Sequence, residues 1–414
     1  MAGYGTSTIR LGGIPGGYPT DPHEAANLNV RYVDEAVVDL SDYKSLKLIK
    51  LCGGLDKGGP WTRAKIEWIE DDLYKRTDTI TGALVTTATA FPVTGKAHRF
   101  PKGTVLEMVE AATPTYAREL MLVTAQASAD QLTVVRGFGP SSDPGTTYAS
   151  GTKFRVAGFA HAENQAWTPI LTSLKAVEYN YSSIIAFSVQ ATFRDMGIAR
   201  YGQGGLGKDF DEQVAKAVKR ATIEVEQNIL LGRRNVGTGT TDPSMTGGLL
   251  EFVDSSFGGP NSASIVETDK SGNPLTLKDI NDSLQSVAET VGEENVARTL
   301  LTGYWGQRKI NSFFEPSVRL ERDTNEVGLL IQRLDTVIGE VEIVADAHMP
   351  EGVILFLAPE QVSVGPMAGY GRMFVDDNPT RAGDYFERFV YADYANMIKN
   401  PVTMSKILNF STSS

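Results

Sequence analysis

Cysteine and histidine are scarce in this chain of 414 residues, which limits the metal and redox chemistry that short motifs could support. The one cysteine, Cys52, cannot form an intramolecular disulfide or a two-cysteine metal motif. The histidines, His23, His98, His161 and His348, lack i,i+4 spacing, so a metal site would have to be assembled from distant segments. The sequence therefore predicts no metal site and a protein suited to a reducing compartment.

Long apolar runs and excess positive charge are also absent. Nowhere do about 18 apolar residues follow one another, and the first residues show no basic stretch followed by an apolar one. Asp and Glu number 50 against 39 Lys and Arg, which gives a net charge of −11. This sign is wrong for a protein that neutralises many phosphates. We therefore expect neither secretion, nor membrane spanning, nor sequence-independent nucleic-acid binding.

The composition is typical of a folded protein with several domains. Hydrophobic residues make up 41% and charged residues 21%, which is too apolar for intrinsic disorder. The length predicts two or three domains. The 41 glycines and 19 prolines predict many turns and long loops rather than a helical bundle.

The sharpest enzymatic signal is a glycine-rich stretch, Gly202–Gly207, followed by Lys208. Its sequence fits the G-x-G-x-x-G pattern and nearly fits a phosphate-binding loop. However, Asp209 stands where that loop needs a hydroxyl group for Mg²⁺, and its carboxylate would repel phosphates. The preceding residues, 192–201, are too charged for the buried strand of a dinucleotide-binding fold. We expect no catalytic residues and no cofactor; a nucleotide-binding enzyme that uses Gly202–Lys208 is an alternative.

Three adjacent acids, Glu70, Asp71 and Asp72, could bind a cation. At the end of a strand, such a run is more typical of a solvated face. We expect no cation site there.

Alternation of apolar and polar residues predicts the two strands of an antiparallel ribbon. Residues 64–69 have the period-two pattern of a strand exposed on one face, and a matching alternation returns at 177–182. Between them, residues 79–159 contain short Val, Thr and Leu runs separated by turns, which is typical of a small barrel or sandwich. We expect an inserted β domain there. Its expected interior residues are Leu106, Val109, Leu122, Val134 and Phe154.

One long amphipathic helix is predicted over residues 209–231, with a length of roughly 35 Å. Acidic residues at its start favour a helix N-terminus, and Gly232 is placed to end it. A capping box of Thr276 and Asp279 predicts the start of a second helix. The apolar stripe of the long helix consists of Phe210, Val214, Val218, Ala221, Val225 and Ile229.

The order of these elements resembles the major capsid protein of tailed bacteriophages, with its Hong Kong 97-type fold. Three stretches resemble one family of phage major head proteins that carries a β insertion in the ribbon loop. Residues 167–192 resemble the end of the ribbon, residues 218–232 the end of the spine helix, and residues 299–314 a strand and helix of the axial domain. The resemblance covers most of residues 60–405.

The resemblance implies an α+β fold with five parts, one of which carries an inserted all-β domain. They are an N-terminal arm (1–50), an extended loop (51–190) with the inserted β domain (79–159), a peripheral domain (191–239 and 369–405) with the spine helix (209–231), an axial domain (240–368) and a C-terminal tail (406–414).

The function implied by the resemblance is that of a shell subunit. Copies of the chain would form hexamers and pentamers of an icosahedral phage head around double-stranded DNA, without sequence-specific binding. The shell would assemble in the cytoplasm of a bacterial host. A separate scaffolding protein is the expected partner, since only about 50 residues precede the ribbon, and a portal and a decoration protein are further candidates. An encapsulin-type compartment shell is the alternative within the same fold.

Candidate assembly residues lie in the arm, the ribbon and the helix stripe. They are Tyr4, Ile9, Leu11, Ile66, Trp68, Tyr179, Tyr181, Val214, Val218, Val225 and Ile229.

Overall fold

The computed structural model describes residues 46–71, 76–93, 97–109, 119–139, 147–163, 166, 175–197, 208–237, 242–259, 261–313, 333–336, 338–369, 371–377 and 383–411. Tyr4, Ile9 and Leu11 of the expected arm lie outside these ranges, as does the stretch Gly202–Gly207. The described helices are α2 (Lys47–Leu51), α3 (Phe193–Met196), α4 (Lys208–Leu231), α5 (Leu249–Phe252), α6 (Leu277–Val291) and α7 (Tyr304–Ser312), with 3-10 turns η1 (Ala97–Arg99), η2 (Ser262–Ser264), η3 (Glu293–Asn295), η5 (Pro359–Gln361) and η6 (Pro401–Thr403).

Two strands form the predicted ribbon. β1 (Lys65–Asp71) pairs with β8 (Lys175–Tyr181) in antiparallel register, and Ile69 lies opposite Val177. The period-two alternation of the sequence therefore identified both strands, because a ribbon with one buried face requires that spacing.

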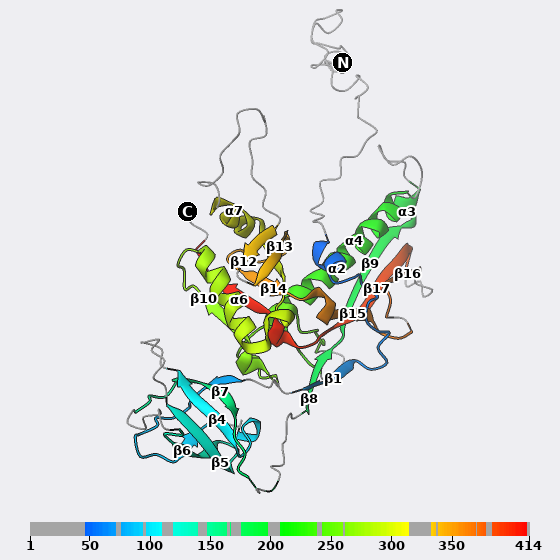
Figure 1. Cartoon of the computed structure of the whole chain (residues 1–414). Coiled ribbons are helices and arrows are strands. Elements are labelled where there is room, and N and C mark those ends of the chain that lie inside the picture. The colour runs from blue at the N-terminus through cyan, green and yellow to red at the C-terminus, as the bar shows by residue number, and fades with distance from the viewer. Residues whose placement is uncertain are drawn as a thin grey trace, which may run out of the picture. The chain divides into compact units, whose positions relative to one another are not determined.

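A six-stranded sheet lies between the two ribbon strands in the sequence (Figure 1). Its order is β2-β7-β4-β5-β6-β3, and every pair is antiparallel. Phe91 and Phe100 pack edge-on against Phe154 in a buried cluster whose residues all belong to this segment. The strands are β2 (Thr77–Thr79), β3 (Ala90–Pro92), β4 (Thr104–Val109), β5 (Leu120–Ser128), β6 (Gln131–Arg136) and β7 (Lys153–Phe159).

The expected interior of this small sheet is partly wrong. Leu106, Val134 and Phe154 are buried as predicted, but Leu122 and Val109 are only half-buried. In β5 the inward positions are Met121 and Val123, one residue on either side of Leu122. A continuous apolar run does not show which of its residues face inward, so the sequence could not fix this register.

A second six-stranded sheet is mixed, with the order β10-β18-β14-β11-β13-β12. β11 pairs in parallel with β13 and antiparallel with β14. The helix α6 contacts this sheet and begins with the predicted capping box, in which Thr276 and Asp279 exchange hydrogen bonds. The strands are β10 (Val266–Asp269), β11 (Thr299–Thr302), β12 (Arg333–Thr336), β13 (Gly339–Ala345), β14 (Ile354–Leu357) and β18 (Ser405–Leu408). The sheet thus includes β18, at residues expected in the peripheral domain and the C-terminal tail.

The remaining sheet contains β15, β17 and β16 in that order, and β9 pairs with β17. Its strands are β9 (Ser183–Thr192), β15 (Val362–Pro366), β16 (Phe374–Asp377) and β17 (Tyr385–Ile398). The long helix predicted over 209–231 is α4, which begins one residue earlier.

The described chain divides into two compact units, and the division falls within β9, α4 and β17. One unit includes Ser188–Val218 and Asp376–Phe389, and the other includes Tyr43–Phe187, Lys219–Val375 and Val390–Ser414. The ribbon and both six-stranded sheets belong to the second unit.

Candidate assembly surface

The two faces of the ribbon differ in exposure. Along β1, Ile66, Trp68 and Glu70 are buried, whereas the residues between them are exposed. The expectation of a solvated face at the acids is therefore wrong for Glu70. Its Oε1 accepts hydrogen bonds from Trp68 Nε1 (3.0 Å) and from the backbone N–H of Asn400 (3.0 Å), and burial raises its pKa.

On the outer face, two large apolar side chains lie opposite each other. Ile69 is 70% exposed and Val177 is 58% exposed. Tyr179 and Tyr181 lie on the same face of β8 and are half-buried, and the Lys65 ammonium lies 4.4 Å from the centre of the Tyr179 ring. The outer face therefore offers an apolar pair beside two aromatic rings.

The inner face of β8 is polar, and a buried ion pair fixes it. Glu178 accepts a 2.6 Å hydrogen bond from Nη1 of Arg234, which follows α4, and the same nitrogen donates to the backbone carbonyl of Tyr179 at 2.9 Å. The guanidinium also lies 4.1 Å from the centre of the Tyr179 ring and 4.4 Å from that of Phe257. Arg234 thus satisfies a buried carboxylate and holds the backbone of the strand.

Asn180, two residues after Glu178 in β8, makes a second set of buried hydrogen bonds. Its Nδ2 donates to Oδ1 of Asn396 (2.6 Å) and to the carbonyl of Gly247 (3.1 Å), and its Oδ1 accepts from the N–H of Gly247 (2.8 Å). The hydroxyl of Thr246 donates to the same Asn396 oxygen at 2.6 Å. The ribbon is therefore joined to β17 and to the segment after α4.

An aromatic cluster completes this attachment. The Trp68 ring lies 5.9 Å from that of Phe252, which lies 4.6 Å from that of Phe257. We call this group the ribbon anchor; it consists of Trp68, Glu178, Asn180, Arg234, Thr246, Gly247, Phe252, Phe257 and Asn396.

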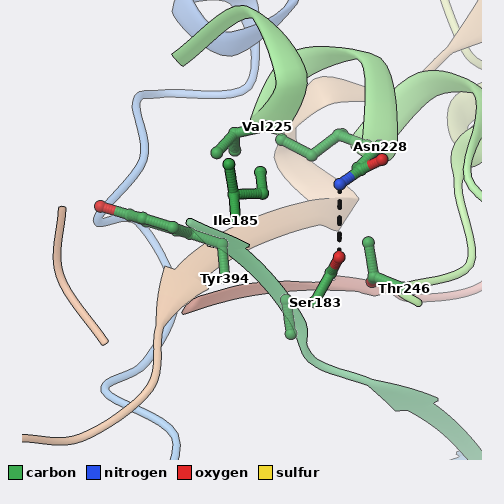
Figure 2. A pocket seen from close by; sticks show the side chains of 8 residues that line it. Ser183, Ile185, Val225, Asn228, Thr246 and Tyr394 are labelled. Carbon is green, nitrogen blue, oxygen red and sulfur yellow. Dashed lines mark hydrogen bonds between the residues drawn. The ribbon is translucent and has the colours of Figure 1, made fainter. Parts of the chain in front are cut away.

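The apolar stripe of α4 is buried within the chain, as its spacing predicts, except at Val218. Val225 and Ile229 are 1% and 2% exposed, whereas Val218 is half-buried. Figure 2 shows Val225 beside Ile185 of β9 and Tyr394 of β17, around a small pocket. Nδ2 of Asn228 donates to the Ser183 hydroxyl (3.3 Å) across this pocket. The stripe therefore holds the helix on the sheet.

The predicted site residues are thus placed in three different settings. Tyr179 and Tyr181 lie on the outer face of the ribbon, and Ile66 and Trp68 lie on its inner face. Val214, Val225 and Ile229 are interior residues of α4. The sequence analysis missed the anchor residues Arg234 and Asn396, because neither stands in a recognisable pattern.

A comparison with models of protein families shows which family this chain belongs to. The model of the SU10 major capsid protein family matches residues 25–411, nearly the whole chain. The chain belongs to this family. The resemblance to phage major capsid proteins is therefore confirmed, and this SU10-type capsid protein is a structural protein of a capsid shell.

Three solved structures that resemble this SU10-type capsid protein are capsids or a compartment shell. The capsid of cyanophage A-1(L) has a TM-score of 0.50 at 10% identity, over 94% of this chain and 98% of that one. The capsid of a native GTA particle has a TM-score of 0.49 at 10% identity, over 94% and 97%. An encapsulin of Synechococcus elongatus PCC 7942 is less similar, with a TM-score of 0.39 at 10% identity over 58% and 79%. Together with the family match, the cyanophage likeness confirms the α+β, Hong Kong 97-type capsid fold.

Among proteins with curated descriptions, none matches this SU10-type capsid protein. Its described helices are all too short or too polar to cross a membrane.

Proposed function

We propose that this capsid protein assembles as hexamers and pentamers into an icosahedral head shell that encloses a double-stranded DNA phage genome. The shell forms in the bacterial cytoplasm and becomes part of the virion. The subunit acts through its surfaces and needs neither catalytic turnover nor a cofactor. The family match and the exposed apolar pair on the ribbon support this proposal.

The apolar pair is the observation that carries the proposal. Every subunit has a net charge of −11, so copies repel one another unless contacts offset that repulsion. Covering a large aliphatic side chain contributes about 1.5–3 kcal/mol, and Ile69 and Val177 are both open to such cover. A shell repeats this contact at every subunit, so a small gain per contact is sufficient.

The other proposed surfaces are the N-terminal arm, through Tyr4, Ile9 and Leu11, and the ring edges of Tyr179 and Tyr181. Ile66, Trp68 and the α4 stripe support assembly indirectly, because they hold the ribbon and the helix in place. The proposal thus assigns the contacts with neighbours to the N-terminal arm and to the outer face of the ribbon.

We further propose the division into parts given by the sequence, with residues 79–159 as a separate β domain. Its self-contained buried cluster supports that division. A separate scaffolding protein, a portal and a decoration protein are proposed partners. The DNA is enclosed without sequence-specific binding, and the net negative charge of the subunit disfavours contacts with the DNA phosphates.

The test compares two identical substitutions at exposed valines. Val177→Asp puts a charge in the proposed contact, and we expect at least about tenfold fewer shells, since losing about 1.5 kcal/mol per contact changes an association constant by that factor. The matched control is Val135→Asp on β6, where the valine is 51% exposed. Shells are counted by negative-stain electron microscopy of the purified full chain, and circular dichroism checks that both variants fold.

Normal shells from Val177→Asp would contradict the ribbon contact. If the parent chain formed no shells with or without co-expressed scaffolding protein, the assembly proposal itself would fail.

A further inference from the structure

Three buried ionisable side chains meet where distant segments converge. Glu226 comes from the inner side of α4, and Asp346 and His348 follow the end of β13. Their side chains are 0%, 0% and 2% exposed. The Nδ1 atom of His348 lies 3.4 Å from Asp346 Oδ1 and 3.8 Å from Glu226 Oε1. We call this group the carboxylate–imidazole cluster.

Each of the three side chains leaves one buried polar atom without a hydrogen-bond partner. Glu226 Oε1 accepts from the backbone N–H of Leu48 (3.0 Å), and Asp346 Oδ1 accepts from the backbone N–H of His348 (2.9 Å). Glu226 Oε2, Asp346 Oδ2 and His348 Nδ1 have no partner in the described part of the chain. A buried polar atom without a partner is destabilising, so three at one point indicate a missing ligand.

The local charge has the sign of a cation site. Glu226 and Asp346 supply two acidic groups, and in the described part of the chain no lysine or arginine forms an ion pair with either of them. The Lys47 ammonium donates instead to the carbonyl of Ala345 (2.7 Å). The cluster therefore holds two carboxylates that no described cation pairs with directly.

We propose that Glu226, Asp346 and His348 bind one divalent transition-metal cation, of which Zn²⁺ and Mn²⁺ are the candidates. One ligand atom from each residue can be chosen so that all three lie within 4.8 Å of one another. Ligands at ~2.0–2.1 Å from a tetrahedral ion are ~3.4 Å apart, close to the separations observed here. The two positive charges of the ion would neutralise both carboxylates.

The donor set also selects the class of metal. Cys52 is not among the residues whose ligand atoms come within 4.8 Å of one another at this point, so the donor set is two carboxylates and one imidazole. Two carboxylates with one imidazole suit Zn²⁺ and Mn²⁺, whereas Mg²⁺ and Ca²⁺ prefer oxygen ligands only.

The cluster lies at a structural joint. α2 lies beside α4 (Figure 1). The backbone N–H of Leu48 in α2 donates to Glu226 of α4, and the Lys47 ammonium donates to the carbonyl of Ala345 at the end of β13. A bound ion would lock α2, α4 and the mixed sheet together. Metal would therefore stabilise the subunit.

The experiment measures metal binding by the full-length protein. The protein is purified from medium supplemented with zinc or manganese, and its metal content is compared with that of protein treated with EDTA. We expect one Zn²⁺ or Mn²⁺ per chain and a melting temperature roughly 3–5 °C higher than that of the stripped protein, with no such effect from Mg²⁺. His348→Gln should bind at least about tenfold more weakly, while the control His161→Gln, at an exposed histidine, should bind like the parent.

Two results would overturn the proposal. One is a parent protein that carries no stoichiometric Zn²⁺ or Mn²⁺ and melts at the same temperature after EDTA treatment; the carboxyl pair would then share a proton instead. The other is metal binding that is unchanged in His348→Gln and in the near-isosteric Asp346→Asn. Circular dichroism of both variants separates a lost ligand from a lost fold.

Discussion

The ribbon anchor and the carboxylate–imidazole cluster are both buried and polar, but only one contains its own cation. In the anchor, Arg234 pairs with Glu178, and the one buried polar side-chain atom without a hydrogen-bond partner is Nδ2 of Asn396. In the cluster, each of the three side chains has such an atom. The difference is that the chain supplies a cation to the buried carboxylate of Glu178 but supplies none to the two carboxylates of the cluster.

The ion pair of Asp254 and Lys406 extends this comparison. Burial of Asp254 opposes ionisation, but hydrogen bonds from Lys406 and Ser256 outweigh burial and lower its pKa to about 2. Burial raises the pKa of Glu226 to about 8, and the charge of Asp346 acts in the same direction. The half-buried Asp254 and the buried Glu226 are thus shifted in opposite directions, because a cation outweighs burial at Asp254 whereas a second acid adds to the effect of burial at Glu226.

The largest expected effect is that of Arg234→Ala. It leaves Glu178 buried without its cation, and we expect the free energy of unfolding to fall by about 3–5 kcal/mol. Urea unfolding of the unassembled subunit measures this change. Adding Glu178→Gln to the variant should restore part of the loss, because it removes the stranded charge.

The control for this substitution is Arg233→Ala at the neighbouring position. Because Arg233 is exposed, its removal should lower the free energy of unfolding by less than about 0.5 kcal/mol. Equal losses from both arginines would mean that the anchor is not held by the buried pair.

A smaller effect is expected from Thr246→Val. The hydroxyl that donates to Asn396 is lost while the shape of the side chain is kept, so stability should fall by about 1–2 kcal/mol. The exposed Thr77 on β2 provides a control of the same chemistry, and Thr77→Val should change stability by less than about 0.5 kcal/mol. Parallel urea titrations compare the two. A neutral Thr246→Val would show that the hydrogen-bond network adds little to the ion pair.

The smallest effect concerns pH. Because the pKa of Asp254 is lower in the folded state than in the unfolded chain, its pairing stabilises the subunit above about pH 4, and this contribution is lost as the pH falls towards 2. Allowing for solvent screening, we expect about 1 kcal/mol, which Asp254→Asn should remove. The measurement is the difference in unfolding free energy between parent and variant at pH 5 and pH 2.5. A difference that does not change with pH would show that Lys406 does not favour the charged form.

Local sequence patterns predicted helices and strands, whereas the ribbon anchor and the carboxylate–imidazole cluster depend on residues that are far apart in the sequence. The alternation at residues 64–69 identified β1, and the apolar stripe identified α4, because each period reflects one buried face. Glu226 stands between stripe residues and is fully buried, which no spacing rule predicts, since its burial depends on Leu48 and His348.

The same limit applies to the ribbon. The alternation separates the residues of β8 into two sets but does not show which set faces inward. The polar set, Glu178 and Asn180, is inside because Arg234 and Asn396 satisfy it, and both come from other parts of the chain. The histidines likewise have no metal-binding spacing, and only the fold brings His348 to two carboxylates.

The position of β18 has a consequence for biosynthesis. This strand lies between β10 and β14 in the mixed sheet, and both partners precede it by long stretches of sequence. The sheet therefore cannot close on the ribosome until residues 405–408 have emerged, and such late, non-local pairing slows folding. Nascent chains stalled before Ser405 would leave the edges of β10 and β14 unpaired. We therefore expect such chains to bind chaperones until residues 405–408 have emerged.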